Sequence, residues 1–197
     1  KLKTGEMGTE ESFMSLSSTG VNVLHLATHG FFWTKENVNE YSKVQFMSLI
    51  DDTNLRENAL LRSGLLLSGA NIALQGRSTS QGIQDGILTA HEIASLDFGD
   101  LDLVVLSACQ TALGEISGDG VFGLQRGFKL AGAQSMLMSL WKVDDTSTRV
   151  LMNEFYKQLL SGQSKSNSLK NAQKMVRSMK GLENPEYWAG FILIDAI

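Results

Sequence analysis

Hydrophobic positions along the chain predict four buried strands. Residues 101–108 (LDLVVLSA) form an almost continuous apolar run, which is typical of a strand covered on both faces. Residues 21–27 are rich in apolar and β-branched side chains and follow a Thr-Gly turn, which also predicts a strand. Residues 134–140 and 191–194 have the same character.

Helical patterns alternate with these strands. Each of four segments opens on a side chain that can cap a helix, carries apolar residues three or four positions apart, and stops at a break in the pattern. The first has the Thr-x-x-Glu spacing of a capping box. The segments begin at Thr89, Asp119, Asp145 and about Ser168, and they end at or before Leu96, Gly132, Gly162 and Gly181. The alternation predicts an α/β fold with a mostly parallel sheet flanked by helices.

Two polar segments interrupt this rhythm. Residues 33–58 show no sustained periodicity of hydrophobic positions, which predicts a long insertion loop. Residues 75–86 are rich in Gly, Ser and Gln, a composition that predicts a second loop. At 197 residues the chain is the size of a single domain, 1–197. Because it starts at Lys1 rather than Met, we expect it to be a piece of a longer protein.

Composition narrows the classes of protein. Hydrophobic residues make up 43% and charged residues 19%, which excludes a disordered chain. The net charge is −4 and no dense Lys/Arg cluster is present, so nucleic acid is not expected as a partner. The sequence has neither a secretory leader nor an apolar run long enough to span a bilayer, which predicts a cytoplasmic protein without a membrane partner.

The candidate chemistry lies where strands end. His29 follows the strand at 21–28 and Cys109 follows the strand at 101–108, so both side chains are expected at the carboxyl edge of the sheet, where ligands bind in such folds. If the two strands are neighbours, the imidazole can take the thiol proton and Cys109 becomes a nucleophile. The backbone N–H groups of Gly30 and Cys109 could then bind an oxyanion. The alternative is a structural, buried cysteine.

Two rival motifs are weaker. His25 and His29 would form a zinc-binding pair on a helix, but their neighbours favour a strand, and no further ligand cluster is present. Residues 118–123 fit the dinucleotide pattern G-x-G-x-x-G and leave a nucleotide-binding α/β domain as an alternative. However, ten residues separate these glycines from the preceding strand, and Asp119 would place a carboxylate against the pyrophosphate.

Four acidic residues follow strands on the expected active edge. Asp144 and Asp145 come after the strand at 134–140, and Glu115 and Asp119 follow Cys109. Together they could form an acidic wall that binds a basic substrate residue. The alternative is that Asp145 caps the next helix and Asp144 is solvated.

Several blocks of sequence occur together and in order, and they cover nearly the whole chain. They are residues 24–31 (LHLATHGF), 65–71 (LLLSGAN), 85–93, 105–114 (VLSACQTALG), 118–133 (GDGVFGLQRGFKLAGA), 139–145 (SLWKVDD) and 187–194 (YWAGFILI). With these blocks the chain resembles the CHAT domain family, which is similar to caspases and separases, the clan CD cysteine peptidases.

The resemblance implies a caspase-hemoglobinase-like fold and a His–Cys dyad at His29 and Cys109 that hydrolyses a protein or peptide substrate without a metal or cofactor. It also implies a bacterial, cytoplasmic enzyme in which this chain is the C-terminal part of a longer protein and follows an N-terminal regulatory or repeat region. Ser107-Ala108 precede Cys109 in place of the Gln-Ala of caspases, and His29 lies 80 positions earlier, which favours the separase-like side. An alternative within the family is an interaction module whose dyad is idle until a sensor acts.

Overall fold

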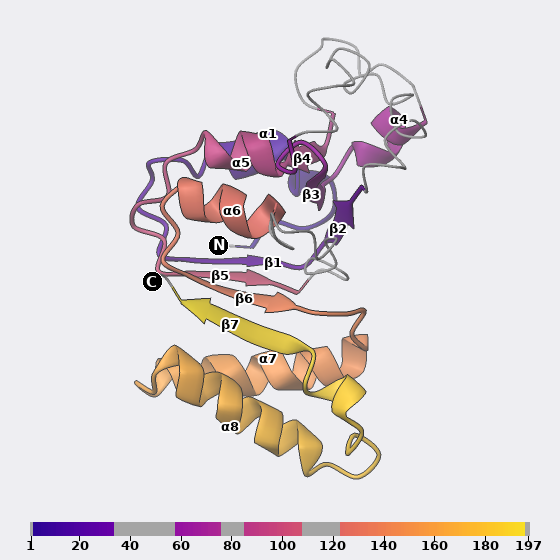
Figure 1. Ribbon diagram of the computed structural model, residues 1–197, viewed down its shortest axis with the longest axis vertical. Coiled ribbons are helices and arrows are strands. Elements are labelled where there is room, and N and C mark those ends of the chain that lie inside the picture. The colour runs from indigo at the N-terminus through magenta and orange to yellow at the C-terminus, as the bar shows by residue number, and fades with distance from the viewer. Residues whose placement is uncertain (1, 34–57, 76–84, 108–122, 196–197) are drawn as a thin grey trace.

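A four-stranded sheet forms the centre of the molecule (Figure 1). The computed structural model describes residues 2–33, 58–75, 85–107 and 123–195. The strand order is β1-β5-β6-β7, with bounds Val23–Leu26, Leu103–Leu106, Ser135–Ser139 and Phe191–Asp195. β1, β5 and β6 are parallel, and β7 is antiparallel to β6. All four predicted strands are present, and the α/β class with a mostly parallel sheet is confirmed.

Helices cover both faces of this sheet (Figure 1). One face carries α1 (Glu10–Met14), α5 (Ala90–Ala94) and α6 (Gly123–Leu130), and the other carries α7 (Asp145–Leu160) and α8 (Lys165–Arg177). Alternate β5 side chains therefore enter different cores. Val104 and Leu106 pack in the core that contains Phe128 of α6, whereas Leu103 and Val105 pack in the core that contains Phe155 of α7. Two covered faces explain the unbroken apolar run of β5.

A second, antiparallel sheet was not expected from the sequence. It contains β2 (His29–Phe32), β3 (Ser63–Leu66) and β4 (Ile87–Thr89) in the order β2-β3-β4. Helix α4 (Ala70–Leu74) packs beside it in a small core, where the rings of Phe31 and Trp33 stack 4.4 Å apart. Short 3-10 helices, η1 (Gly5–Met7) and η3 (Pro185–Tyr187), complete the described elements.

Helix ends test the capping predictions. The capping box of α5 is confirmed: the Glu92 N–H donates to Thr89 Oγ1 at 3.2 Å, and the Thr89 N–H donates to Glu92 Oε2 at 2.7 Å. Ser164 caps α8, so this helix begins three residues earlier than predicted. The cap expected at Asp119 lies outside the described residues, as do positions 34–57 and 76–84 of the two predicted loops.

Candidate active site

The carboxyl ends of β1 and β5 lie side by side. The two strands are neighbours and parallel, with Leu26 opposite Leu106, and the Ser107 N–H donates to the Leu26 carbonyl at 3.1 Å. The condition set by the sequence analysis, that these two strands be neighbours, is therefore met. His29 follows the end of β1 by three positions, and Cys109 follows the end of β5 by three positions.

Three predicted site residues fall in the part of the sequence that the structure does not describe. Cys109, Glu115 and Asp119 lie within residues 108–122. Their contacts with His29 and with substrate therefore stay predictions, as does the glycine-rich alternative at 118–123, of which the structure describes only Gly123. Gly123, the first described residue after this gap, packs so closely on β3 that a Cβ would overlap the Ser63 side chain, so packing alone requires glycine there.

His29 belongs to the second sheet. The sequence placed it at the close of the first strand, but β1 ends at Leu26 and His29 opens β2, where it lies opposite Leu66 of β3. The Thr28 hydroxyl also donates to the Leu66 carbonyl, which fixes the turn between the two sheets. The His29 side chain is exposed, so it is accessible to substrate.

The backbone N–H of Gly30 points away from β3. The Trp33 N–H donates to the Arg62 carbonyl, and backbone-bonded pairs alternate with non-bonded pairs in antiparallel sheets. It follows that His29 and Phe31 form the bonded pairs with β3, whereas Gly30 is in a non-bonded pair with Leu65. A donor aimed outward from an edge strand, next to an accessible imidazole, is suitable for binding a carbonyl oxygen.

The sequence missed a hydrogen-bonded group at the same edge. His25 of β1 lies between two hydroxyls, with Nε2 2.9 Å from Ser107 Oγ and Nδ1 3.0 Å from the Tyr156 hydroxyl of α7. The His25 ring remains partly open to solvent, but neighbouring atoms displace enough water to lower its pKa. Burial also raises the pKa of Tyr156 to about 12. Both groups therefore stay uncharged near neutral pH.

Asp144, and not Asp145, caps α7. The Ser147 N–H donates to Asp144 Oδ2 at 2.8 Å, and this hydrogen bond lowers the pKa of the Asp144 carboxyl. The prediction that Asp145 is the cap was wrong by one residue; Asp145 is the first residue of the helix and is exposed. Both follow β6, whose carboxyl end lies beside that of β5, so the acidic pair is at the expected edge (Figure 1).

A groove of about 800 Å³ runs beside the outer edge of β1. Leu24, His25 and Thr28 line one side of it, and residues 2–9 contribute to the other. Because Thr28 directly precedes His29, this groove offers room for an extended chain next to the imidazole.

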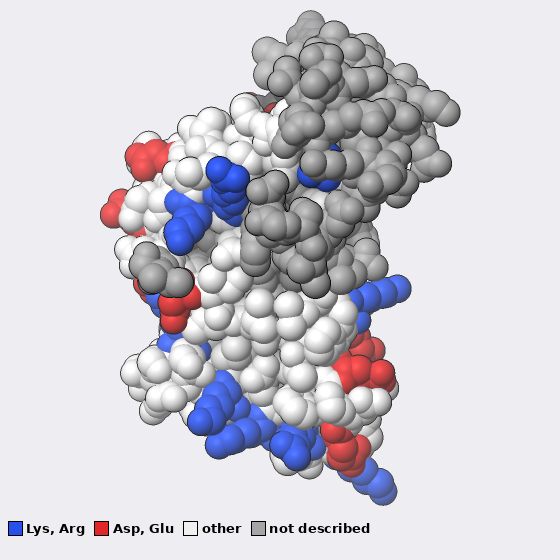
Figure 2. Space-filling model, viewed as in Figure 1, with Lys and Arg blue, Asp and Glu red and all other residues white. Residues whose placement is uncertain are grey.

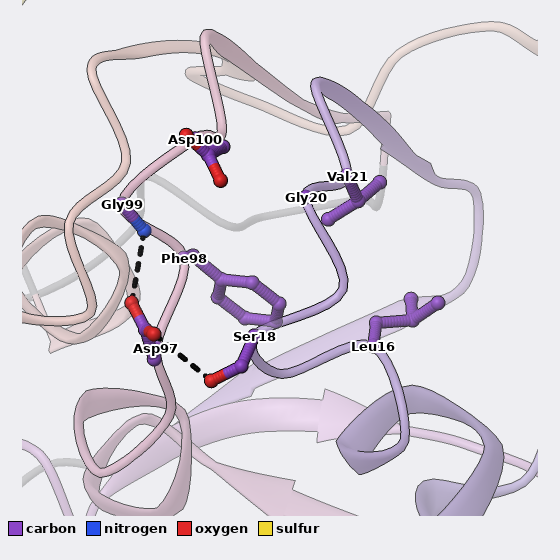
Figure 3. A pocket seen from close by; sticks show the side chains of 8 residues that line it. All are labelled: Leu16, Ser18, Gly20, Val21, Asp97, Phe98, Gly99 and Asp100. Atoms are coloured by element: carbon purple, nitrogen blue, oxygen red, sulfur yellow. Dashed lines mark hydrogen bonds between the residues drawn. The ribbon is translucent and has the colours of Figure 1, made fainter.

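A much smaller cavity lies near the amino ends of the strands, at the end of the sheet opposite the candidate site (Figure 3). Its volume is about 20 Å³, which suffices for roughly one water molecule. Asp97 holds its wall together by accepting hydrogen bonds from the Ser18 hydroxyl and from the Gly99 N–H. The cavity lies just before the amino ends of β1 and β5, so it is remote from His29.

Charged side chains are dispersed on the face shown in Figure 2, with uncharged surface between them. The basic side chains at the bottom of this view lie over α8, whose exposed residues include Lys170, Lys174 and Arg177. Figure 1 places α8 in the lower part of the molecule and β2 in the upper half, so these cations are away from the candidate site.

The described residues contain neither a candidate metal centre nor a candidate membrane span. Within residues 2–33, 58–75, 85–107 and 123–195, no group of three or more His, Cys, Asp or Glu side chains could hold a metal ion. In the same part of the chain, none of the helices has the length and apolar character needed to cross a membrane.

Comparison with known proteins gives a family. The family model described as CHAT domain matches residues 1–196. Tetratricopeptide repeat protein 28 of Mus musculus is 31% identical over 192 residues, which cover 98% of this chain and 8% of that protein. Tetratricopeptide repeat protein 28 of Homo sapiens is 39% identical over 114 residues, which cover 58% of this chain and 5% of that protein. The chain thus matches less than a tenth of the length of these relatives.

Proposed function

The chain belongs to the CHAT domain family, a member of the caspase-like peptidase clan, and from that premise we propose that it is a cysteine endopeptidase with Cys109 as nucleophile and His29 as general base. The observation that carries the proposal is the adjacency of β1 and β5. Parallel neighbours end at the same edge, so the segments that lead to His29 and to Cys109 leave the sheet side by side.

The proposed reaction has two halves. His29 takes the proton of the Cys109 thiol, and the thiolate attacks the carbonyl carbon of a peptide bond. The N–H groups of Gly30 and Cys109 stabilise the resulting oxyanion, and His29 then donates its proton to the leaving amine. Water, deprotonated by His29, hydrolyses the thioester and regenerates the thiol. No step requires a metal ion or a cofactor.

Cleavage of a denatured proteome tests this proposal. Incubation with the purified chain should create new peptide amino termini, detected by mass spectrometry. Cys109 is the one cysteine among the 197 residues, so prior treatment with iodoacetamide blocks a single thiol and should abolish these termini. Termini that appear equally after alkylation, or no termini from the untreated chain, would contradict an autonomous cysteine peptidase.

The acidic residues at the edge support a preference for Lys or Arg before the scissile bond. Asp144 and Asp145 follow β6 on this edge, and Glu115 and Asp119 follow Cys109 in the sequence. We expect Asp145→Asn to lower kcat/KM about two- to fivefold for peptides with a basic residue there, because an exposed ion pair contributes little more. Peptides with a neutral residue at that position should be unaffected.

Asp100→Asn is the matched control for this specificity. Asp100 is exposed and lies before β5, at the opposite edge, so removing its charge should leave both classes of peptide unchanged. A preference for acidic or large apolar residues in the unmodified chain would contradict the proposed acidic wall.

A second candidate function is that of a regulated module. The two relatives are named for tetratricopeptide repeats, and this chain matches less than a tenth of their length. We propose that an N-terminal repeat or regulatory region of the same protein controls the dyad. A purified chain that leaves the proteome uncut, but whose thiol reacts rapidly with iodoacetamide near pH 7, would favour this regulated form over the autonomous enzyme.

A further inference from the structure

His25 joins three separate elements through its imidazole. Nε2 is 2.9 Å from the Ser107 hydroxyl at the end of β5, and Nδ1 is 3.0 Å from the Tyr156 hydroxyl of α7. The rings of His25 and Tyr156 are also in contact, with centroids 5.6 Å apart. Both ring nitrogens therefore have a partner, and the two partners are 49 positions apart in the sequence.

A neutral His25 ring can bond both hydroxyls at once, because one ring nitrogen donates and the other accepts. Tyr156 keeps its proton because burial raises its pKa, so its O–H can donate to Nδ1 while the Nε2–H of neutral His25 donates to Ser107 Oγ. Within the described residues, the groups facing the imidazole are these two hydroxyls, and water displacement alone accounts for its lowered pKa. The result is an uncharged chain of hydrogen bonds.

This hydrogen-bond network lies at the end of β5, just before the proposed nucleophile in the sequence. Ser107 is the first residue after β5 and precedes Cys109 by two positions. Tyr156 is anchored because its neighbour Phe155 is fully buried in the core between α7 and the sheet. His25 lies on β1, four positions before His29, which is the first residue of β2. A hydrogen-bond network between α7 and the end of β5 restricts the position of Ser107.

We propose that His25 is a positioning residue that fixes the end of β5 against α7 and thereby holds Cys109 at its working distance from His29. This inference rests on the proposed peptidase function, because it concerns the same dyad. In this role His25, Ser107 and Tyr156 do not contact the reacting atoms; they act through the backbone that leads to the thiol.

Hydroxyl and imidazole variants test this role. Tyr156→Phe and Ser107→Ala each remove one hydroxyl and preserve most of the packing, and His25→Leu removes both hydrogen bonds. Each should lower kcat for peptide cleavage about tenfold with KM little changed, and His25→Leu should have the largest effect. His25→Gln keeps an amide near the Nε2 position, so it should recover part of the loss.

The reactivity of the thiol provides a readout that general destabilisation would not reproduce. From the pH dependence of iodoacetamide alkylation, the apparent pKa of Cys109 should rise toward the ordinary thiol value of about 8.5 in Tyr156→Phe and His25→Leu. His91→Gln is the matched control, because His91 is an exposed histidine of α5 and its replacement should leave alkylation and cleavage unchanged. Melting temperatures establish that the variants are folded.

The possible failures are distinguishable. If the unmodified chain cleaves peptides and the His25 and Tyr156 variants cleave and alkylate equally well, the positioning role is wrong and the peptidase proposal stands. If neither the unmodified chain nor any variant cleaves peptides, the proposal of an autonomous peptidase fails. In that case alkylation still decides the inference: a changed thiol pKa in Tyr156→Phe supports it, and an unchanged one overturns it.

Discussion

Replacing His29 with alanine is expected to lower kcat/KM for peptide cleavage about a thousandfold and to leave the chain folded. An isolated thiol is only a few per cent ionised at neutral pH, so few molecules would carry the thiolate. Without His29 the proposed mechanism also lacks the acid that protonates the leaving amine. The fold should survive because His29 is exposed and pairs with β3 through its backbone. Steady-state kinetics on a peptide found by proteome cleavage, with melting temperatures of both proteins, measure the two effects.

His91→Ala provides the control for this substitution. His91 is also exposed, but it lies on α5, so its replacement should change kcat/KM by less than about twofold. Alkylation of Cys109 near pH 7 should slow in His29→Ala and not in His91→Ala. A His29→Ala protein that keeps more than a tenth of the original kcat/KM would remove His29 from the proposed mechanism.

The central sheet could be predicted because its strands are buried on both faces. In β5, Leu103 to Leu106 are all fully buried, and the pattern reflects two cores rather than one. When amphipathic helices separate such apolar runs, few folds other than a mostly parallel sheet with helices on both faces can bury them. The sequence could not give the direction of β7, because both directions require the same apolar side chains.

The second sheet was missed because its strands are short and their pairing is remote. β2 (HGFF) and β3 (SGLL) contain only four residues each, and Phe32 lies opposite Ser63, 31 positions later. Neither alternation nor a two-residue turn marks this pairing. The consequence for the site is direct, because His29 opens β2 and its backbone is fixed by β3 instead of by β1.

The edge location of the candidate site followed from the sequence, but its supporting contacts did not. The rule that ligands gather at carboxyl ends of parallel strands needs only the strands and their neighbours. The contact between His25 and Tyr156 joins residues 131 positions apart, so no local motif indicates it. The available signal was alternation: Leu24 and Leu26 face the core with α6, so His25 between them must face the side of α7. Likewise, either Asp144 or Asp145 satisfies the capping pattern, and the helix start decides between them.

A second large effect is expected at a buried acid far from the dyad. Glu10, the first residue of α1, is 2% exposed, and its Oε2 accepts a hydrogen bond from the Gly86 N–H at 3.1 Å. Burial, followed by repulsion from Glu92 and Asp85, raises the pKa of this carboxyl from about 4.5 to about 7, although the Gly86 hydrogen bond opposes the shift. The folded state therefore holds a proton that the unfolded chain releases.

This raised pKa makes stability fall as pH increases. Between about pH 4.5 and pH 7 the folded state binds more protons than the unfolded state, so the free energy of unfolding decreases through this window and stays lower above it. Glu10→Gln removes the titration and keeps an acceptor for Gly86. At pH 8 we expect the variant to be more stable by about 2 kcal/mol, seen as a melting temperature about 4 to 8 °C higher. At pH 5 the two proteins should melt nearly together.

Glu11→Gln separates this effect from the loss of a negative charge on α1. Glu11 is the next residue of the same helix and is exposed, so its replacement should give no comparable gain at pH 8. Because Asp85 and Glu92 also have raised pKa values, some decline with pH should persist in Glu10→Gln. Thermal unfolding at pH 5 and pH 8 decides the matter: an equal pH dependence in Glu10→Gln and in the unmodified chain would show that Glu10 does not carry the buried proton.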